Sequence, residues 1–474
     1  MRKHQGILHL LLLYLLPFTI LIMALLFGAP VLVSGQTIDT DAIGSTDEQQ
    51  EWEDSWQNVT GDAEAEPKGP SLFGYVEVRG NTVYDEGSQQ FRTGFSSRFR
   101  LKGEWQPSDC ITARMEILYH DKYGTINPLT VYNQLGINPQ TLLQSDNPQD
   151  SFVEGLDLDH AWAVVNLGNF DLSFGKLPLA WGNAWLYNPT DRLSATPALE
   201  DREAETTGTI AVIPVWYPGD CWAIEGTLVF AQRGTGEAAL IGSADPGNLP
   251  LGLRVKGYAA GFDFSFSAVR EVWYTGAAGG YLPADPTTPA ESWEHGYFIG
   301  LDTVGSIGPL GMYLEATLAI PQSGNSIDFQ SDWEIADAVD LSTGLEYMNG
   351  PYTAKTEFIY SSAGTNSPET YDPGLLLGGR SFLLARQYLL IYGSRTIGDF
   401  FETIATALIN LNDGSSIVSA ELMYPFRDNF EASASCSWPF GPAESEFNGK
   451  FDLGTGKIVD IMQPEISVSL KTSF

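Results

Sequence analysis

The sequence predicts an all-β protein: a transmembrane antiparallel up-and-down β-barrel of about 18 strands, with 16 as the alternative count. Three observations support this fold class. Apolar and polar residues alternate along one segment after another, short and long connections alternate between these segments, and large aromatic residues gather beside the short connections. Alternation with a period of two indicates strands, because successive strand side chains point to opposite faces of a sheet.

The N-terminal end has the composition of a secretory signal. Arg2 and Lys3 precede an apolar run over residues 7–27, and small residues follow as far as Gly35. We therefore predict a signal peptide over residues 1–35, cleaved before Gln36. An uncleaved anchor helix is the alternative, because the run is long enough to span a bilayer. Pro17 and the small residues after the run favour cleavage.

Residues 36–70 differ in composition from everything that follows and form an acidic leader. Residues 36–69 contain ten acidic side chains and one basic side chain, a balance that predicts disorder. A binding or plug role stays open, although the leader is too short for a folded plug domain. From residue 71 onward the composition is uniform, so residues 71–474 are predicted to form one barrel.

The composition excludes several classes of function. The chain carries a net charge of −34, and removing Arg2 and Lys3 leaves −36, which argues against nucleic acid as a partner. Cysteine and histidine residues show no spacing typical of a disulfide framework or a metal site. The glycine-rich stretches 233–238 and 454–457 lack the spacing of a phosphate-binding loop, and no GxSxG sequence occurs. We expect no enzymatic activity, no catalytic residues, no metal and no cofactor.

The clearest strand pair lies at residues 91–105 and 110–120. On the first strand, the apolar face holds Phe91, Phe95, Phe99, Leu101 and Trp105, and the polar face holds Arg92, Arg98, Arg100, Lys102 and Glu104. On the second strand, Ile111, Ala113, Met115, Ile117 and Tyr119 share one face, and Thr112, Arg114, Glu116 and His120 share the other, with Leu118 as the exception. A soluble sheet could show this pattern once, so the connections must decide.

The connections alternate between short turns and long loops along the whole chain. The long ones are 121–157, 178–206, 233–249, 273–295, 320–338, 362–383 and 439–463. The predicted strands start near residues 71, 91, 110, 158, 170, 207, 221, 250, 261, 296, 310, 339, 352, 384, 400, 416, 430 and 465. Outer-membrane barrels have short periplasmic turns, long external loops and strands that are apolar outside and polar inside. An even strand count then places both ends of the barrel on the periplasmic side.

Aromatic residues mark the level of the short turns. They are Trp105, Trp216, Tyr217, Trp222, Tyr347, Tyr352, Tyr424, Phe426 and Phe430. Aromatic girdles lie where a barrel meets the membrane interface. The outward faces carry almost no charge, as expected, because an Arg or Lys facing lipid at mid-membrane costs about 2–4 kcal/mol.

The last ten residues, EISVSLKTSF, alternate and end on an aromatic residue. Val468, Leu470 and Phe474 resemble the C-terminal signal of bacterial outer-membrane barrels. The resemblance implies recognition by the barrel-assembly machinery and a location in the bacterial outer membrane, with its lipid as a partner. Closure is required there, because an open sheet edge would leave backbone groups unsatisfied in lipid.

The inward charges are the predicted pore lining. Bases concentrate on two neighbouring strands as Arg92, Arg98, Arg100, Lys102 and Arg114, accompanied by Glu104 and Glu116. A barrel of this size is wide enough for an aqueous channel, and charged side chains at a constriction would set its selectivity. The alternative is that these charges solvate the inner wall and neutralise one another.

Residues 174–205 form the most distinctive connection and the candidate constriction loop. Its large aromatic, amide and charged residues are Trp181, Trp185, Tyr187, Asn188, Asp191, Arg192, Asp201 and Arg202. Connections rarely expose so many aromatics, so we expect this one to fold back into the barrel, where aromatics could stack on sugar rings. A structured external loop is the alternative. The stretch GKLPLAWGNAWLYNPTD resembles a motif of porin-like outer-membrane barrels, some related to alginate-export and carbohydrate-porin families.

Together these features predict a channel for passive diffusion of small hydrophilic solutes, with sugars or organic ions as the solute classes. The alternative function is a non-conducting barrel that acts as a surface adhesin or structural protein through its acidic loops. The sequence leaves open whether barrels associate as a homotrimer.

Overall fold

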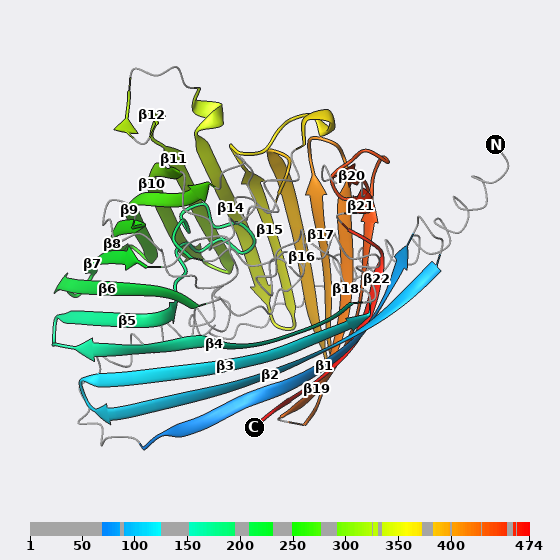
Figure 1. Ribbon diagram of the computed structural model, residues 1–474, viewed down its shortest axis with the longest axis horizontal. Helices are drawn as coiled ribbons and strands as arrows, with labels where there is room; N and C mark the ends of the chain where they lie inside the picture. Colours follow the sequence, from blue (N-terminus) through cyan, green and yellow to red (C-terminus); the bar gives the residue numbers. More distant parts are fainter. Residues whose placement is uncertain are drawn as a thin grey trace.

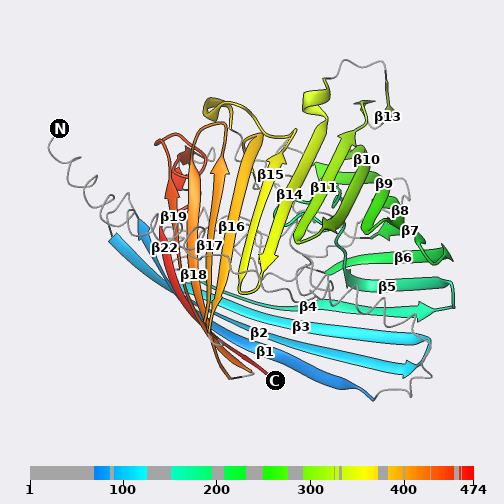
Figure 2. The same cartoon turned by 180° about the vertical axis from the view of Figure 1, so that it is seen from behind.

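The computed structural model is one closed β-barrel (Figures 1 and 2). It describes residues 69–85, 90–124, 151–194, 208–230, 249–275, 292–324, 326–329, 334–371, 383–398, 401–427, 429–452, 458–460 and 462–474. The predicted signal peptide and nearly all of the acidic leader lie outside these ranges. Within them, no helix is long and apolar enough to cross a membrane.

Eighteen antiparallel strands form the main sheet. They are β1 (Ser71–Asp85), β2 (Gln90–Ser108), β3 (Ile111–Gly124), β4 (Ser151–Asn166), β5 (Phe170–Pro178), β6 (Gly208–Gly219), β7 (Trp222–Val229), β8 (Leu251–Ala259), β9 (Phe262–Thr275), β10 (Ser292–Ile307), β11 (Leu310–Ala319), β14 (Val339–Asn349), β15 (Tyr352–Tyr360), β16 (Gln387–Ile397), β17 (Phe401–Asn410), β18 (Ser416–Arg427), β19 (Phe430–Phe440) and β22 (Glu465–Ser473). Within this sheet, each strand pairs with the strands that precede and follow it along the chain. The predicted fold class is therefore confirmed, with 18 strands rather than 16.

The first and last strands close the sheet. β1 pairs with β2 on one side and with β22 on the other, where Tyr75 lies opposite Ser473. The backbone of Phe474 continues this ladder, because its N–H donates to the carbonyl of Gly74 and its carbonyl accepts from the Gly74 N–H. Closure leaves no sheet edge to be satisfied in lipid.

The predicted strand start is late for β4 and early for β16, and two connections on the long-loop side are short. β4 begins at Ser151 rather than near residue 158, and β16 begins at Gln387 rather than near residue 384. Residues 86–89 and 411–415 join their strands on the long-loop side with few residues. Short elements occupy three longer connections: the hairpins β12–β13 (Gln322–Ser323, Ser326–Ile327) and β20–β21 (Lys450–Asp452, Ile458–Asp460), and the 3-10 turns η3 (Ile335–Asp337) and η4 (Pro368–Thr370).

The distribution of apolar and polar side chains is the reverse of that in a soluble protein: apolar side chains lie on the outside and polar side chains on the inside. Large apolar side chains on the outer face are exposed, among them Phe91 at 70% and Trp105 at 51%. Charged and hydroxyl side chains on the inner face are buried, among them Arg100, Glu315 and Glu357. A large apolar surface on the outside of a sheet needs a cover, and a bilayer supplies it around the whole barrel.

Most of the predicted aromatic girdle lies on the outer face at the short-turn side. Trp105, Trp216, Trp222, Tyr347 and Phe426 are exposed there. Arg395, which also ends a strand on this side, places its guanidinium 5.0 Å from the centre of the Tyr352 ring. Tyr217 departs from the prediction, because it packs against the apolar cluster inside the barrel.

Candidate functional site

Residues 179–194 follow β5 and lie inside the barrel, against the inner faces of β7, β10, β11, β14 and β15. Figure 1 shows this segment as a teal coil without strands that lies beside β14. The indole of Trp181 donates to Glu225 of β7, and the side-chain amide of Asn183 donates to Asp302 of β10. Arg192 pairs with Asp340 of β14. We call residues 179–194 the docked segment.

Two glutamates on the barrel wall hold the backbone of the docked segment. Glu357 of β15 accepts hydrogen bonds from the backbone N–H groups of Trp185, Leu186 and Tyr187, at 2.9, 3.0 and 3.0 Å. It also accepts from the hydroxyls of Ser342 and Tyr313. A carboxylate with this many donors is well satisfied although it is buried.

Glu315 of β11 holds the preceding turn of the docked segment in the same way. It accepts from the backbone N–H groups of Asn183 and Ala184 and, at 3.1 Å, from the hydroxyl of Thr190. Glu315 is 0% exposed and Glu357 is 1% exposed. Both acids of the wall are therefore committed to positioning the segment rather than to solvent.

Glycine residues make room for this close approach. A Cβ at Gly252 of β8 would lie 2.5 Å from the Trp181 ring and 2.8 Å from Leu193. Gly182 has φ +103°, a backbone conformation that favours glycine, and a Cβ there would lie 2.5 Å from the Glu315 carboxylate. The close packing of the docked segment against the wall therefore requires glycine, which has no Cβ, at both positions.

An apolar cluster joins the docked segment to the inner wall of the barrel. It contains Trp162, Leu177, Leu179, Trp181, Leu193, Ala211, Ile213, Val215, Val229 and Val269. Strand β6 contributes three of these and is apolar on both faces, unlike the alternating strands around it. Strands buried on both faces read as continuous apolar runs, so the sequence of β6 indicates that something covers its inner face.

Ion pairs fasten the polar end of the docked segment. The Arg192 guanidinium pairs with Asp340 and lies 4.4 Å from the centre of the Phe298 ring. Burial alone would lower the pKa of Arg192, but the Asp340 carboxylate outweighs it and raises the pKa above its ordinary value. Asp302, which holds Asn183, is itself paired with Arg254 at 3.2 Å. Asp191 binds the backbone N–H and hydroxyl of Ser194.

Trp185 lies at the edge of the docked segment, beside a second group of polar and aromatic side chains. Its ring is 4.7 Å from that of Tyr392, edge to face. The ammonium of Lys355 lies 5.6 Å from the Trp185 ring and pairs with Glu346 at 2.9 Å. These four side chains are partly or largely buried. We call them the aromatic platform.

A second group of loop residues also packs inside, next to the docked segment. Leu383, Ala385 and Phe447 pack on inward side chains of β15, β16 and β17, and on Trp185, Leu186 and Tyr187. Glu446 anchors this group by accepting from the Leu384 N–H, the Tyr388 hydroxyl and the Asn410 side chain. Burial raises the pKa of the Glu446 carboxyl to about 7.

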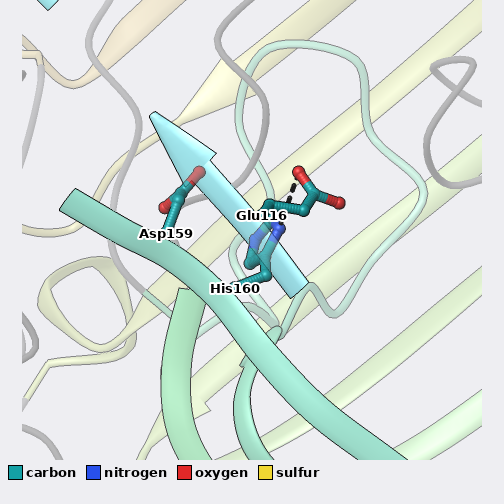
Figure 3. Close-up of side chains that lie close together, drawn as sticks. All are labelled: Glu116, Asp159 and His160. Atoms are coloured by element: carbon teal, nitrogen blue, oxygen red, sulfur yellow. Dashed lines mark ion pairs between the residues drawn. The ribbon is translucent and has the colours of Figure 1, made fainter. Parts of the chain in front are cut away.

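The predicted basic strands carry a buried charge cluster. Arg100 of β2 donates to Glu116 of β3 at 2.9 Å and pairs with Asp159 of β4 at 3.0 Å. Figure 3 shows Glu116, Asp159 and His160 side by side, with the imidazole Nδ1 3.2 Å from the Glu116 carboxylate. A β-bulge opposite Glu116 leaves Asp159 without a partner in the ladder, and bulges re-aim side chains. Both Asp159 and His160 are therefore buried within this cluster.

The charge cluster offers one ligand atom each from Glu116, Asp159 and His160, all within 4.8 Å of one another. Such a set could hold a divalent cation. The Arg100 guanidinium already bridges the two carboxylates, however, and a cation there would meet its positive charge. The donor set therefore does not fit a resident metal, and it acts as a charge-paired tie between β2, β3 and β4.

The other predicted site residues are distributed as follows. Arg114 pairs with Glu104 at 3.3 Å and lies 5.6 Å from the Trp162 ring. Arg92, Arg98 and Lys102 are half-buried on β2, on the face of Arg100. The backbone carbonyl of Asn188 accepts from the Asp191 N–H. Asp201 and Arg202 lie outside the described residues. The C-terminal residues Val468, Leu470 and Phe474 are exposed on the outer face.

Sequence reasoning missed the residues that hold the docked segment. Glu315 and Glu357 stand at polar positions of alternating strands, but no local pattern shows that backbone N–H groups surround them. His160 has no ligand spacing in the sequence, and neighbours such as Asp159 and His160 share a face only because of the bulge. The doubly apolar strand β6 is a further signal in the sequence, which could have indicated which part of the inner wall the segment covers.

Comparisons with known proteins find similarity to solved structures only. No family model matches the sequence, and no curated protein matches it. A triply substituted porin from Rhodopseudomonas blastica is 14% identical, with a TM-score of 0.41, over 85% of this chain and 100% of the other. A doubly substituted form of that porin has 15% identity and the same TM-score and coverage. A closed barrel of 18 antiparallel strands is itself a porin-like architecture, and that description stands on the strand pairings of this chain.

Proposed function

We propose that the protein is a porin-like channel of the bacterial outer membrane, through which small hydrophilic solutes diffuse passively. The observation that carries this proposal is the closed 18-strand barrel with an apolar outer face and a polar inner face. Barrels of this strand number enclose an aqueous channel unless segments fill them. Diffusion needs no catalytic group, so the proposal includes no enzymatic activity.

Hydroxyl groups on the inner wall support a water-filled path. On β18, β19 and β22, serine side chains pair across the strands: Ser419 with Ser437, Ser435 with Ser467, and Ser433 with Ser469, at 3.2, 2.7 and 2.9 Å. These pairs line the inner wall next to β1, on the side where β1 pairs with β22 and not on the side of β2. Small hydroxyl side chains leave space and offer donors and acceptors to water and to polar solutes.

The docked segment supports the proposal of a constriction. It fastens to β7, β10, β11, β14 and β15, so it narrows the barrel from that side. Its edge presents the aromatic platform of Trp185, Tyr392, Lys355 and Glu346. We propose that solutes pass this edge and that sugars are the favoured class, because an aromatic face and flanking charged groups suit the apolar faces and hydroxyls of a sugar ring.

Liposome swelling with neutral sugars of increasing size tests both parts. Liposomes that contain the folded protein should swell in small sugars, with a rate that falls as the sugar grows. Trp185→Leu should change the relative rates for sugars. Trp438→Leu is the matched control, because Trp438 is an exposed outer-face residue. Equal rates in liposomes with and without protein would contradict the channel. Equal effects of the two substitutions would contradict only the sugar path.

A further inference from the structure

Two polar side chains interrupt the apolar inner wall of β5 and β6, which lie side by side (Figure 1). They are Asp171 and Ser173, which are 2% and 1% exposed. Asp171 lies opposite Val215 of β6, and Ser173 lies opposite Val164 of β4 and Ile213 of β6. Side chains directly opposite one another on a sheet are in contact range, so aliphatic groups flank both polar side chains.

The hydrogen bonding of these two side chains is incomplete within the described ranges. Oδ1 of Asp171 and Oγ of Ser173 are buried and have no hydrogen-bond partner there. The carboxylate of Asp171 accepts from the hydroxyl of Tyr217. On β4, Asn166 lies opposite Asp171, but its side-chain oxygen accepts from the Gly168 N–H at 3.0 Å. Because buried polar groups are nearly always bonded to protein, water or an ion, two such oxygens on one face of a strand indicate a ligand.

The charge of Asp171 identifies the class of ligand. Among the described residues, no Lys, Arg or His side chain pairs with this carboxylate. Glu225 of β7 lies opposite Val215 on the far side of β6, and it is paired with Lys256 at 3.3 Å. That pair therefore brings no positive charge to Asp171. Burial of a carboxylate without a counter-charge is unfavourable, so this position of the inner wall favours a cation.

We propose that Asp171, Ser173 and Tyr217 bind a singly charged cation, either a free alkali ion or the ammonium group of a small solute. We call these three residues the cation site. The carboxylate and the two hydroxyls offer oxygen atoms to a metal ion and acceptors to an ammonium group. A divalent ion fits less well, because one carboxylate leaves half of its charge unbalanced among apolar groups. The binding is independent of the proposed function, whereas passage of cations past the site rests on it.

Sodium-23 NMR of the folded protein in detergent measures the binding directly. Exchange of sodium ions with the cation site should broaden the sodium line, and added methylammonium chloride should reverse the broadening. Asp171→Asn should weaken the sodium affinity by about 10-fold or more, because it removes the one charge of the site. Asp263→Asn is the matched control, because Asp263 is an inward acid of β9 that is exposed. The control should retain the affinity of the parent protein.

Unfolding in urea gives a second readout, which a purely structural role of Asp171 would not produce. A cation that binds only the folded barrel stabilises it, and at ten times its dissociation constant it lowers the unfolding equilibrium constant about tenfold. The urea midpoint of the parent should therefore fall when tetraethylammonium, which is too large for the site and has no N–H group, replaces sodium at constant ionic strength. Ser173→Ala and Tyr217→Phe should each reduce this difference, and Asp171→Asn should abolish it.

The outcomes separate the cation site from the channel. Sodium binding that is equal in the parent and in Asp171→Asn overturns the cation site, and so does a urea midpoint that is the same with sodium, methylammonium and tetraethylammonium. Stabilisation by sodium alone supports a site for an alkali ion, and stabilisation by methylammonium alone supports a site for the ammonium group of a solute. A bilayer without conductance, together with cation binding, overturns the channel and retains the site. Conductance without cation binding does the reverse.

Discussion

Glu357 is predicted to hold the docked segment in place, and its removal should release the segment without unfolding the barrel. In Glu357→Ala the backbone N–H groups of Trp185, Leu186 and Tyr187 lose their common acceptor. A buried donor left without a partner costs about 1–3 kcal/mol. Three such donors cost roughly 3 kcal/mol even at the low end, which is about a 100-fold change in a docking equilibrium.

Hydrogen exchange of the amides at residues 183–187 measures this change directly. Exchange should be about 100-fold faster in Glu357→Ala, because the undocked segment exposes these amides to water. Glu421→Ala is the matched control, because it removes an acid of β18, away from the strands that anchor the segment. The mobility of folded and boiled protein in detergent gels should stay unchanged in both variants. Unchanged exchange in a folded Glu357→Ala barrel would refute the role of this carboxylate.

Three further predictions concern other parts of the barrel. Glu446 has a pKa raised to about 7 from an ordinary value near 4.5, so its contribution to stability is fully present below about pH 4.5 and is lost as the pH rises through 7. That contribution to the free energy of unfolding is roughly 3 kcal/mol. The urea midpoint of unfolding should fall between about pH 4.5 and about pH 7 in the parent protein and should change less in Glu446→Gln. Parallel curves of the urea midpoint against pH in the two proteins would contradict the raised pKa of Glu446. Arg100→Met leaves two buried carboxylates without their shared base and should lower the free energy of unfolding by about 3–5 kcal/mol, whereas adding Glu116→Gln and Asp159→Asn should restore much of it; no recovery would argue against the charge cluster. Deleting Phe474 removes the backbone pair with Gly74 and should reduce the yield of heat-modifiable barrel in cells, whereas Phe474→Tyr should not; normal assembly of the deletion would contradict the C-terminal signal.

The barrel was predictable from the sequence because the membrane imposes a pattern on every strand. Lipid outside and polar groups inside force alternation, so the starts of β1, β5, β11, β14, β15, β18, β19 and β22 match the predicted positions. The strand ends on the long-loop side were less accurate. β4 begins at Ser151, and the bulge at Asp159 interrupts the alternation between this start and the rest of the strand, so the local pattern gives no boundary there.

The interior was less predictable, because it depends on contacts between distant parts of the chain. The aromatic composition of residues 181–187 predicts a segment inside the barrel, but not the wall to which it binds. Glu315 and Glu357 look like any other inward acids until the segment is placed against them. Asp159 and His160 show the same limit, because a single bulge, invisible in the local pattern, brings both of them into the charge cluster.

The most direct test of the proposed channel is the ion conductance of the purified, folded protein in a planar bilayer, with the reversal potential measured under a salt gradient. An open channel should give discrete, steady conductance steps. The sign of the reversal potential then shows whether the inward bases of β2 and β3 or the inward acids of the other strands dominate the path. A bilayer that stays silent after insertion has been confirmed would contradict the channel and would favour a closed barrel that acts through its loops.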